Sequence, residues 1–469
     1  LNMTTAYVAL PNIQGNLSAG PDQVGWIITT FVVASAVGTI LTGWLGTQLG
    51  RRRVFLGAIA GFTLTSALCG WATSLEELVF YRAIQGFVSA PLLPLSQAIM
   101  LDIYPRRRHG FAMSIWSMGM ILGPVIGPTV GAMVTEWYGW RYVFLLNIPM
   151  GFLAFAGVFL TLPEGVRRPQ PLDWIGVATL IIAVVSLQMM LDRGERLDWF
   201  NSTEIILELS VAVIAFYLFV VHSLTHDSPY INVAIFRDRN FVVGLALIFM
   251  FGVAVFSSLF ILPVFLQKIQ DYPVLAAGWM TSVRGVGTMI AMMMGGFLAD
   301  RLPAKYLILT GVICVGAASV LMTTWTADVG GLEIAWLTML SGFGMGVMWV
   351  TLTTVTFSTL APEFRTEGAA MFALIRAIGA SLGTSIIVAV IVRSSQINYI
   401  ELRDHITPFN NPLRDALPTW DLNTIAGLAA LQKLIVTQAE TIAYLNAFAF
   451  LVAVAVATAP LIFLLRKTR

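Results

Sequence analysis

The sequence predicts an all-α polytopic membrane protein, and three observations lead to this prediction. Of the 469 residues, 57% are hydrophobic and only 11% are charged, whereas a soluble globular chain is about half apolar and about a quarter charged. The apolar runs are about 20 residues long, the length of helix that crosses a hydrocarbon core of about 30 Å. They lack the alternating polarity of a membrane β-barrel strand. This composition excludes a disordered tail, a collagen, a disulfide scaffold, a nucleic-acid binder and an ordinary cytosolic enzyme.

Apolar runs between polar breaks predict fourteen membrane spans. The sequence has no starting Met and opens inside an apolar run, so we expect the first span to be incomplete. The predicted spans cover residues 1–14, 23–47, 54–73, 77–100, 110–134, 140–162, 173–191, 204–224, 240–267, 274–298, 305–324, 332–359, 367–393 and 441–465.

The loops between these spans alternate in charge, which predicts the orientation of the chain. One set carries more than half of the Lys and Arg residues, in clusters such as Arg51-Arg52-Arg53 and Arg106-Arg107-Arg108. The opposite set is acidic or mixed. Because cationic loops stay in the cytoplasm, both termini are expected there, as an even number of spans requires.

An internal repeat divides the chain into two related halves. The segment 43–52 after the second span resembles 296–305 after the tenth, and 104–113 resembles 361–371. Spans 1–6 therefore match spans 9–14, an arrangement in which the substrate site lies between the halves near the middle of the membrane. We expect an N-terminal bundle over 1–165, inserted helices over 166–226, and a C-terminal bundle over 227–469 with a long periplasmic loop over 394–439.

That long loop contains Pro408, Pro412 and Pro418, followed by a run from Leu422 to Gln438 with the pattern of an amphipathic helix. Two interpretations stay open. The loop is a surface flap, or it is a docking surface for another protein.

Five stretches of the first half carry motifs of one transporter family. They lie in successive spans and in one loop, and they are Leu1–Pro11, Gly43–Arg52, Arg82–Gly86, Gly119–Pro128, and Trp140–Phe144 together with Asn147–Pro149. Together they resemble the major facilitator superfamily in its fourteen-helix drug:proton antiporter branch. The chain is similar to the Emr-type multidrug efflux pumps of tripartite systems.

The resemblance implies a secondary active exporter, not an enzyme, that works by alternating access. It implies proton-coupled efflux of hydrophobic drugs or toxic weak acids across the bacterial inner membrane, with a periplasmic adaptor protein and an outer-membrane channel as partners. One alternative is a dedicated exporter of a fatty-acid or siderophore-like metabolite, or an uncoupled facilitator. Another is a membrane sensor or scaffold that uses a transporter fold.

The chain departs from the family pattern at two positions. Asn2 stands where the first signature usually has an acid, so this position does not offer the usual protonation site, whether Asn2 is natural or an engineered stand-in for a protonated acid. Thr47 stands where the loop motif usually has Asp, although Asp300 keeps that acid in the second half. The second departure weakens a charge-paired gate in the N-terminal half.

Three arginines lie inside predicted spans, where an unpaired charge costs at least about 2.5 kcal/mol. Arg82 is about 9 Å deep, and Arg284 and Arg376 are about 15 and 14 Å deep, counted at 1.5 Å per residue. One interpretation is that backbone carbonyls and hydroxyls satisfy each guanidinium, above all at Arg82. The other is a cationic cavity that favours anionic or weakly acidic lipophilic substrates.

These patterns and the resemblance together select three groups of candidate residues. The predicted substrate cavity contains Asn2, Trp26, Arg82, Trp116, Arg284, Trp349 and Arg376. The fifth-span motif, a hinge or simply a tightly packed face, contains Gly119, Gly123, Pro124, Gly127 and Pro128. The predicted cytoplasmic gate contains Gly43, Gly50, Arg51, Asp300 and Arg301.

Signals for enzyme chemistry are missing from the sequence. There is no GxxxxGK[ST] motif, and His109, His222, His226 and His405 form no HExxH motif and no recognised metal spacing. We therefore expect no catalytic residue, no cofactor and no metal.

Overall fold

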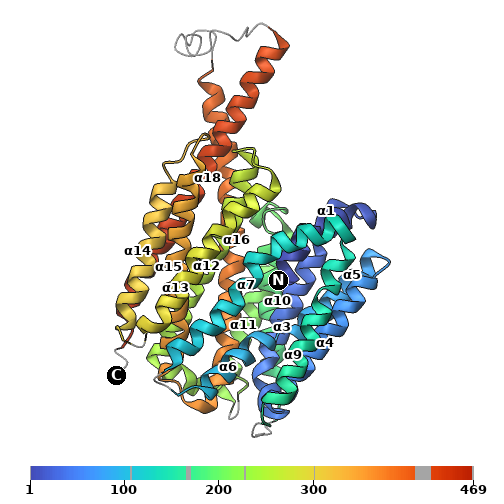
Figure 1. Cartoon of the computed structure of the whole chain (residues 1–469), viewed down its shortest axis with the longest axis vertical. Helices are drawn as coiled ribbons and strands as arrows, with labels where there is room; N and C mark the ends of the chain where they lie inside the picture. Colours follow the sequence, from blue (N-terminus) through green and yellow to red (C-terminus); the bar gives the residue numbers. More distant parts are fainter. Residues whose placement is uncertain are drawn as a thin grey trace.

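The computed structural model describes residues 2–105, 108–164, 171–226, 229–299, 301–406 and 424–466, and every regular element in these ranges is a helix (Figure 1). Eleven candidate spans there are long and apolar enough to cross a membrane. Three further helices, α1, α7 and α13, pack among them at the places of predicted spans. The predicted all-α polytopic fold is confirmed.

The N-terminal bundle contains two spans that are broken into paired helices. Pro91 follows the end of α5, where its ring and its missing N–H interrupt the helix, and α6 begins at the next residue. A second break at Leu146 separates α8 from α9. The helices are α1 (Asn2–Asn16), α2 (Pro21–Val24), α3 (Trp26–Gln48), α4 (Arg51–Trp71), α5 (Leu75–Ser89), α6 (Leu92–Ile103), α7 (His109–Tyr138), α8 (Arg141–Leu145) and α9 (Asn147–Thr161).

The inserted pair and the C-terminal bundle complete the fold. The inserted helices are α10 (Trp174–Arg193) and α11 (Thr203–Thr225), with the short 3-10 helix η2 (Trp199–Asn201) between them. The C-terminal bundle contains η3 (Val233–Arg237), α12 (Arg239–Lys268), α13 (Val274–Ala299), α14 (Ala304–Met322), α15 (Gly331–Ser358), η4 (Pro362–Phe364), α16 (Arg365–Asp404) and α18 (Ile425–Phe463).

The two bundles pack against each other in a reciprocal way. The second span of the N-terminal bundle, α3, packs on the fifth span of the C-terminal bundle, α16, and the fifth span α7 packs on the second span α13. The fifth span of each bundle also contacts the fourth span of the other bundle: α7 contacts α15, and α16 contacts α6. In Figure 1, α7 lies between the bundle of α12–α15 and that of α3–α5. Two related halves therefore enclose one shared interface.

Several basic side chains lie at helix ends on one face of the molecule, which we call the basic face and define by Arg51, Arg239, Lys305 and Arg365. The Arg239 side chain donates to the carbonyl of Leu464 at 2.8 Å, and Lys305 donates to the carbonyl of Phe463 at 3.1 Å. Such cations satisfy the last carbonyls of α18 and complement its dipole.

The outer surface of the bundles exposes apolar side chains. On α9, Phe152 and Leu153 are 70% and 71% exposed, and Leu160 is 80% exposed. A ring of apolar side chains of this kind faces lipid in a membrane protein, because water cannot solvate it favourably.

The helices α16 and α18 extend past the other helices at the end opposite the basic face (Figure 1). They have 40 and 39 residues, and at 1.5 Å per residue each is about 60 Å long, twice the hydrocarbon thickness. The segment expected as a loop over 394–439 is therefore largely helical: α16 continues to Asp404 and α18 begins at Ile425. Hydropathy predicts only the apolar part of a helix, whereas the backbone hydrogen bonds of α16 and α18 continue into their more polar parts. The prolines at 408, 412 and 418 lie outside the described residues.

Candidate functional site

Two tryptophans meet where the bundles face each other. The rings of Trp116 on α7 and Trp349 on α15 stack with centroids 6.1 Å apart and planes inclined by 13°. The indole N–H of Trp349 donates to the Ser117 hydroxyl at 2.7 Å, and that of Trp116 donates to the Ser96 hydroxyl at 2.9 Å. A buried indole needs such a partner, so these bonds fix both rings at the interface.

Arg376 of α16 approaches the same aromatic group. Its guanidinium carbon lies 6.0 Å from the ring centroid of Trp349 and 5.9 Å from that of Phe256, a distance at which a cation is attracted to a ring face. Its Nε atom is buried and has no hydrogen-bond partner among the described residues. Arg376 lies about 16 Å along α16 from its first residue.

Arg284 of α13 is a second buried cation without a full set of partners. Its side chain is only 5% exposed, and its Nε and Nη1 atoms lack a hydrogen-bond partner within the described part of the chain. A Cβ atom added at Gly342 of α15 would collide with the Arg284 backbone, so glycine is what allows α15 to pack this closely. Arg284 lies about 15 Å along α13 from its start.

Arg82 of α5, in contrast, has several partners. It is fully buried and donates to the Asn2 Oδ1 atom at 2.6 Å, to the Gln85 Oε1 atom at 2.7 Å and to the Ile27 carbonyl at 3.1 Å. Its guanidinium also lies 4.2 Å from the ring centroid of Phe31. Polar groups of the chain therefore satisfy this guanidinium, as one of the two interpretations proposed, although the acceptors are one backbone carbonyl and two side-chain amide oxygens rather than hydroxyls. The Nδ2 atom of Asn2 is buried without a partner in the described ranges.

The predicted cavity residues thus form two groups and two single residues. Trp116, Trp349 and Arg376 lie together, Asn2 and Arg82 are hydrogen-bonded, and Arg284 lies at the contact of α13 and α15. Trp26 is the first residue of α3 and is 54% exposed.

An ion-pair network at the basic face joins the two bundles. Asp102, next to the end of α6, accepts from Arg51 at the start of α4 and from Arg365 at the start of α16, the latter at 2.7 Å. Arg365 also donates to the carbonyl of Leu101 at 3.1 Å. In the structure these contacts close the interface at the basic face.

The other predicted gate residues lie around this network or outside the described residues. Gly50 has a φ of 89°, a conformation that glycine adopts without strain, and it turns the chain between α3 and α4 so that Arg51 begins the next helix. Gly43 packs against Glu367 of α16. Arg301 is exposed, and Asp300 lies outside the described residues.

The glycine-rich face of α7 packs mainly on α1. A Cβ atom added at Gly131 would lie 2.8 Å from the Cα atom of Thr5, whereas one added at Gly119 would meet nothing within 4 Å. The Thr4 hydroxyl donates to the carbonyl of Gly123 at 3.5 Å. Gly127 is buried on the same helix, and the side chains of Pro124 and Pro128 lie outside what the structure describes.

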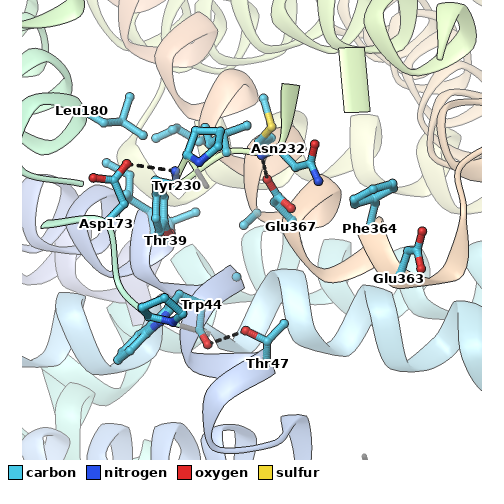
Figure 2. A pocket seen from close by; sticks show the side chains of 18 residues that line it. Thr39, Trp44, Thr47, Asp173, Leu180, Tyr230, Asn232, Glu363, Phe364 and Glu367 are labelled. Atoms are coloured by element: carbon cyan, nitrogen blue, oxygen red, sulfur yellow. Dashed lines mark hydrogen bonds between the residues drawn. The ribbon is translucent and has the colours of Figure 1, made fainter. Parts of the chain in front are cut away.

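A cavity of about 570 Å³ opens between α3, the start of α10, the segment that leads to α12, and α16 (Figure 2). Its wall contains three carboxylates, of Asp173, Glu363 and Glu367, and the rings of Trp44, Tyr230 and Phe364. None of the described residues that line it is Lys or Arg. The wall is therefore negatively charged and aromatic.

Tyr230 and Asn232 connect this wall to both bundles (Figure 2). The Tyr230 hydroxyl donates to the carbonyl of Ile40 in α3, and the backbone N–H of Asn232 donates to Glu367 at 2.8 Å. Burial raises the pKa of the Tyr230 hydroxyl, so this group stays a donor at neutral pH.

Asp173 caps the first turn of α10 and accepts from three groups. Burial by itself would raise the pKa of Asp173, but hydrogen bonds from the Gly176 N–H, the His222 ring and the Tyr230 N–H outweigh it and hold this pKa below its ordinary value. The carboxylate is therefore charged at neutral pH.

Of the residues that line this cavity, sequence reasoning selected only Gly43 as a site residue, and it missed two members of the gate, Asp102 and Arg365. Asp102 lies just before the repeated segment 104–113, and Arg365 lies inside its counterpart 361–371, each at a helix end. This placement is a signal for a contact between the halves. Asp173, Tyr230 and Glu367 come from three distant segments, and the sequence contains no pattern that brings these together.

Two reciprocal six-span bundles around a buried aromatic and cationic interface define a polytopic membrane transporter rather than an enzyme. The chain belongs to the Major Facilitator Superfamily, whose family model matches residues 1–384.

Curated relatives and solved structures agree with this assignment. The chain is 34% identical over 415 residues to the multidrug export protein EmrB of Escherichia coli K12, covering 87% of this chain and 81% of EmrB. It is 31% identical to the fatty acid resistance protein FarB of Neisseria gonorrhoeae, covering 88% and 82%. A crystal structure of a double Trp mutant of XylE superposes with a TM-score of 0.65 at 14% identity, covering 100% and 93%, which shows the shared fold.

Proposed function

We propose that this protein exports lipophilic weak acids and other hydrophobic drugs by alternating access, driven by the proton gradient. The observation that supports this most directly is the pair of arginines inside the spans, Arg284 and Arg376, whose guanidinium groups keep buried nitrogen atoms without a hydrogen-bond partner among the described residues. A buried unpaired donor costs about 1–3 kcal/mol, and more when it is charged. An anionic ligand beside either guanidinium would satisfy such donors.

Aromatic groups beside Arg376 supply the apolar part of this site. Trp349 contacts Phe251 with ring centroids 5.3 Å apart and Phe372 at 6.3 Å, and it stacks on Trp116. A ligand with a ring or acyl chain and one acidic group would bind rings and guanidinium at once. The relatives include one protein named for multidrug export and one named for fatty acid resistance, and a fatty acid combines an acyl chain with one acidic group.

The substrate path that we propose runs through the predicted cavity residues. Trp116, Trp349, Arg284 and Arg376 contact the ligand, and Asn2 with Arg82 forms the N-terminal wall. Trp26 borders the path at the end of α3 away from the basic face. The ion pairs of Asp102 with Arg51 and Arg365 close the opposite end, and we assign Gly43, Gly50, Asp300 and Arg301 to the same gate. The α7 motif at Gly119, Gly123, Pro124, Gly127 and Pro128 is the hinge as the bundles move.

Proton coupling requires a titratable group that moves between the two states, and Glu367 is the group we propose. It is half-buried, accepts from one backbone N–H, and lies where α3 of one bundle meets α16 of the other. A carboxyl with few donors at a moving contact can take up a proton in one state and release it in the other. The electrical part of the gradient then supplies about 2.3 kcal/mol per charge per 100 mV.

Membrane location and orientation follow from the positive-inside rule. We propose that the basic face is cytoplasmic, that both termini lie on that side, and that the membrane is the bacterial inner membrane. We propose that the bundles over 1–165 and 227–469 move relative to each other, and that the inserted helices over 166–226 connect them.

The extension of α16 and α18 would then project into the periplasm, and we propose it as the docking surface for an adaptor protein that connects to an outer-membrane channel. It carries exposed apolar side chains: Ile397 is 56% exposed, Ile400 50%, Ile425 88% and Leu428 53%. Apolar residues at this spacing on a helix pair are suited to pack against a partner helix.

Transport by purified protein in liposomes with an imposed pH gradient tests the export proposal. We expect gradient-driven movement of a lipophilic acid, loss of that movement in Arg376→Gln and Arg284→Gln, and retained transport of a neutral dye. Flux without response to the gradient would identify a facilitator, and no flux at all would identify a sensor or scaffold. A Glu367→Gln variant should still exchange substrate across the membrane but lose the response to the gradient.

A further inference from the structure

Three side chains of metal-ligating type converge beside the inserted helices. Asp173 precedes α10, His222 lies in the last turn of α11, and His226 follows the end of α11. One ligand atom from each of the three lies within 4.8 Å of the other two. The sequence alone assigns these histidines no role, because the acid that joins them is 49 residues upstream of His222.

The helix geometry places the two histidines side by side. Residues four apart share one face of a helix, and the rings of His222 and His226 have centroids 4.9 Å apart. The Nε2 atom of His222 lies 2.8 Å from the Oδ1 atom of Asp173. The three ligand atoms therefore face one small volume.

The carboxylate is held in place from behind. The Gly176 N–H donates to Asp173 Oδ1 at 2.9 Å and the Tyr230 N–H donates to Oδ2 at 3.1 Å, while the Asp173 side chain is only 6% exposed. Hydrogen bonds of this kind orient a carboxylate ligand and reduce the cost of bringing a metal ion to it.

The local charge also favours a cation. Asp173 lines the same cavity as Glu363 and Glu367, and no Lys or Arg belongs to its described wall. The exposed position of His226 leaves an approach from water and room for a solvent ligand.

We propose that Asp173, His222 and His226 bind a divalent transition-metal ion, with Zn²⁺ the best match. Two imidazoles and one carboxylate are a donor set that Zn²⁺ accepts, with ligand bonds of about 2.0–2.2 Å and water in the fourth position. In the metal-bound form the ion replaces the proton shared by His222 and Asp173, and the His226 ring turns inward. The ion would link the start of α10 to the end of α11 and, through Asp173, to the segment at Tyr230.

Metal titration of the full-length protein in detergent, after removal of any affinity tag and of bound metal, tests this site. We expect calorimetry with ZnCl₂ to show one ion per chain, and Co²⁺ to give the intense visible absorption of a four-coordinate site. In His226→Ala the affinity should fall at least about tenfold, the loss of about 1.4 kcal/mol of binding free energy. The matched control is His405→Ala, at the far end of α16, which should bind Zn²⁺ like the parent protein.

Two outcomes would overturn the proposal: no binding at micromolar Zn²⁺ by the parent protein, or equal affinity in the His226→Ala and His405→Ala variants. Because Asp173 and His222 are partly buried and also support the fold, a second variant is needed for the acid. Asp173→Asn keeps an oxygen that accepts from Gly176 but loses the charge, and it should bind Zn²⁺ more weakly while thermal unfolding of the metal-free protein confirms that it is folded. These readouts do not depend on transport, so they stand apart from the export proposal.

Discussion

Arg365, the first residue of α16, and Asp102, the residue before the end of α6, form an ion pair of 2.7 Å across the interface of the two bundles. Arg365 is 7% exposed and also donates to the carbonyl of Leu101. Asp102 pairs with Arg51 of its own bundle as well. The Asp102 carboxylate thereby connects two helix ends of the N-terminal bundle with one of the C-terminal bundle. Separation of the bundles at the basic face must break its ion pair with Arg365.

Replacement of Asp102 by Asn should shift the protein toward the state that is open at the basic face. A buried charge-assisted hydrogen bond is worth about 1.5–3 kcal/mol, but Asp102 is 36% exposed, so we expect about 1 kcal/mol. This corresponds to a roughly fivefold change in the ratio of states. Labelling of a single cysteine introduced beside the gate measures it, and an unchanged labelling rate would contradict the gate assignment.

Replacement of Trp349 by Ala should abolish transport and destabilise the protein. The side chain is 3% exposed and contacts Trp116, Phe251 and Phe372, and removal of a buried aromatic ring costs about 3–5 kcal/mol. Trp349→Phe keeps one aromatic ring but loses the hydrogen bond to Ser117 and part of the ring packing, so it should retain more of the stability and of the transport than Trp349→Ala. Thermal unfolding and flux assays on the two variants separate packing from ligand contact.

Two glycines of α7 provide a matched pair. Gly131→Ala should destabilise the packing of α1 on α7 by about 1–3 kcal/mol, because the new methyl group meets the backbone of Thr5. Gly119→Ala meets nothing within 4 Å and should leave stability unchanged or raise it by up to about 1 kcal/mol through helix propensity. If Gly119→Ala nevertheless slows transport, Gly119 is needed for bending rather than for packing.

Replacement of Asn2 by Asp would place an acid against Arg82. The Asn2 Oδ1 atom already accepts from Arg82 at 2.6 Å, and the amide Nδ2 atom is buried without a partner in the described ranges. A carboxylate there removes the unpartnered donor and forms a buried ion pair, which is broken when the acid takes up a proton. We expect the response of transport to the pH gradient to increase. Asn2→Leu, which cannot pair or titrate, should show no such increase.

Much of the fold could be predicted from the sequence because the bilayer restricts the choice of structure so strongly. In lipid every backbone group must find its partner within the chain, so apolar runs of span length become helices. The span predicted over 240–267 illustrates this, since α12 runs from Arg239 to Lys268. Where water is the solvent, as beyond residue 393 of α16, this restriction ends and hydropathy no longer marks the helix.

The candidate site was less predictable because its contacts join residues far apart in the chain. A charge inside a span draws attention by its cost, and Arg82, Arg284 and Arg376 could be selected on that ground. The difference between them could not be predicted: Arg82 gains Asn2 and Gln85 as partners, while Arg284 and Arg376 keep nitrogen atoms without a partner in the part of the chain that the structure describes. The same holds for Glu367, which lies near a helix end in the sequence and near two bundles in space.

The continuous helix α16 carries Arg365 in its first turn, Arg376 at mid-depth and Ile397 in the part beyond the other helices. A continuous helix of this length can act as a lever, because a tilt of a few degrees displaces its far tip by several ångströms. Under the proposed function, ligand arrival at Arg376 and release of Arg365 would therefore move the tip of α16 without any separate relay.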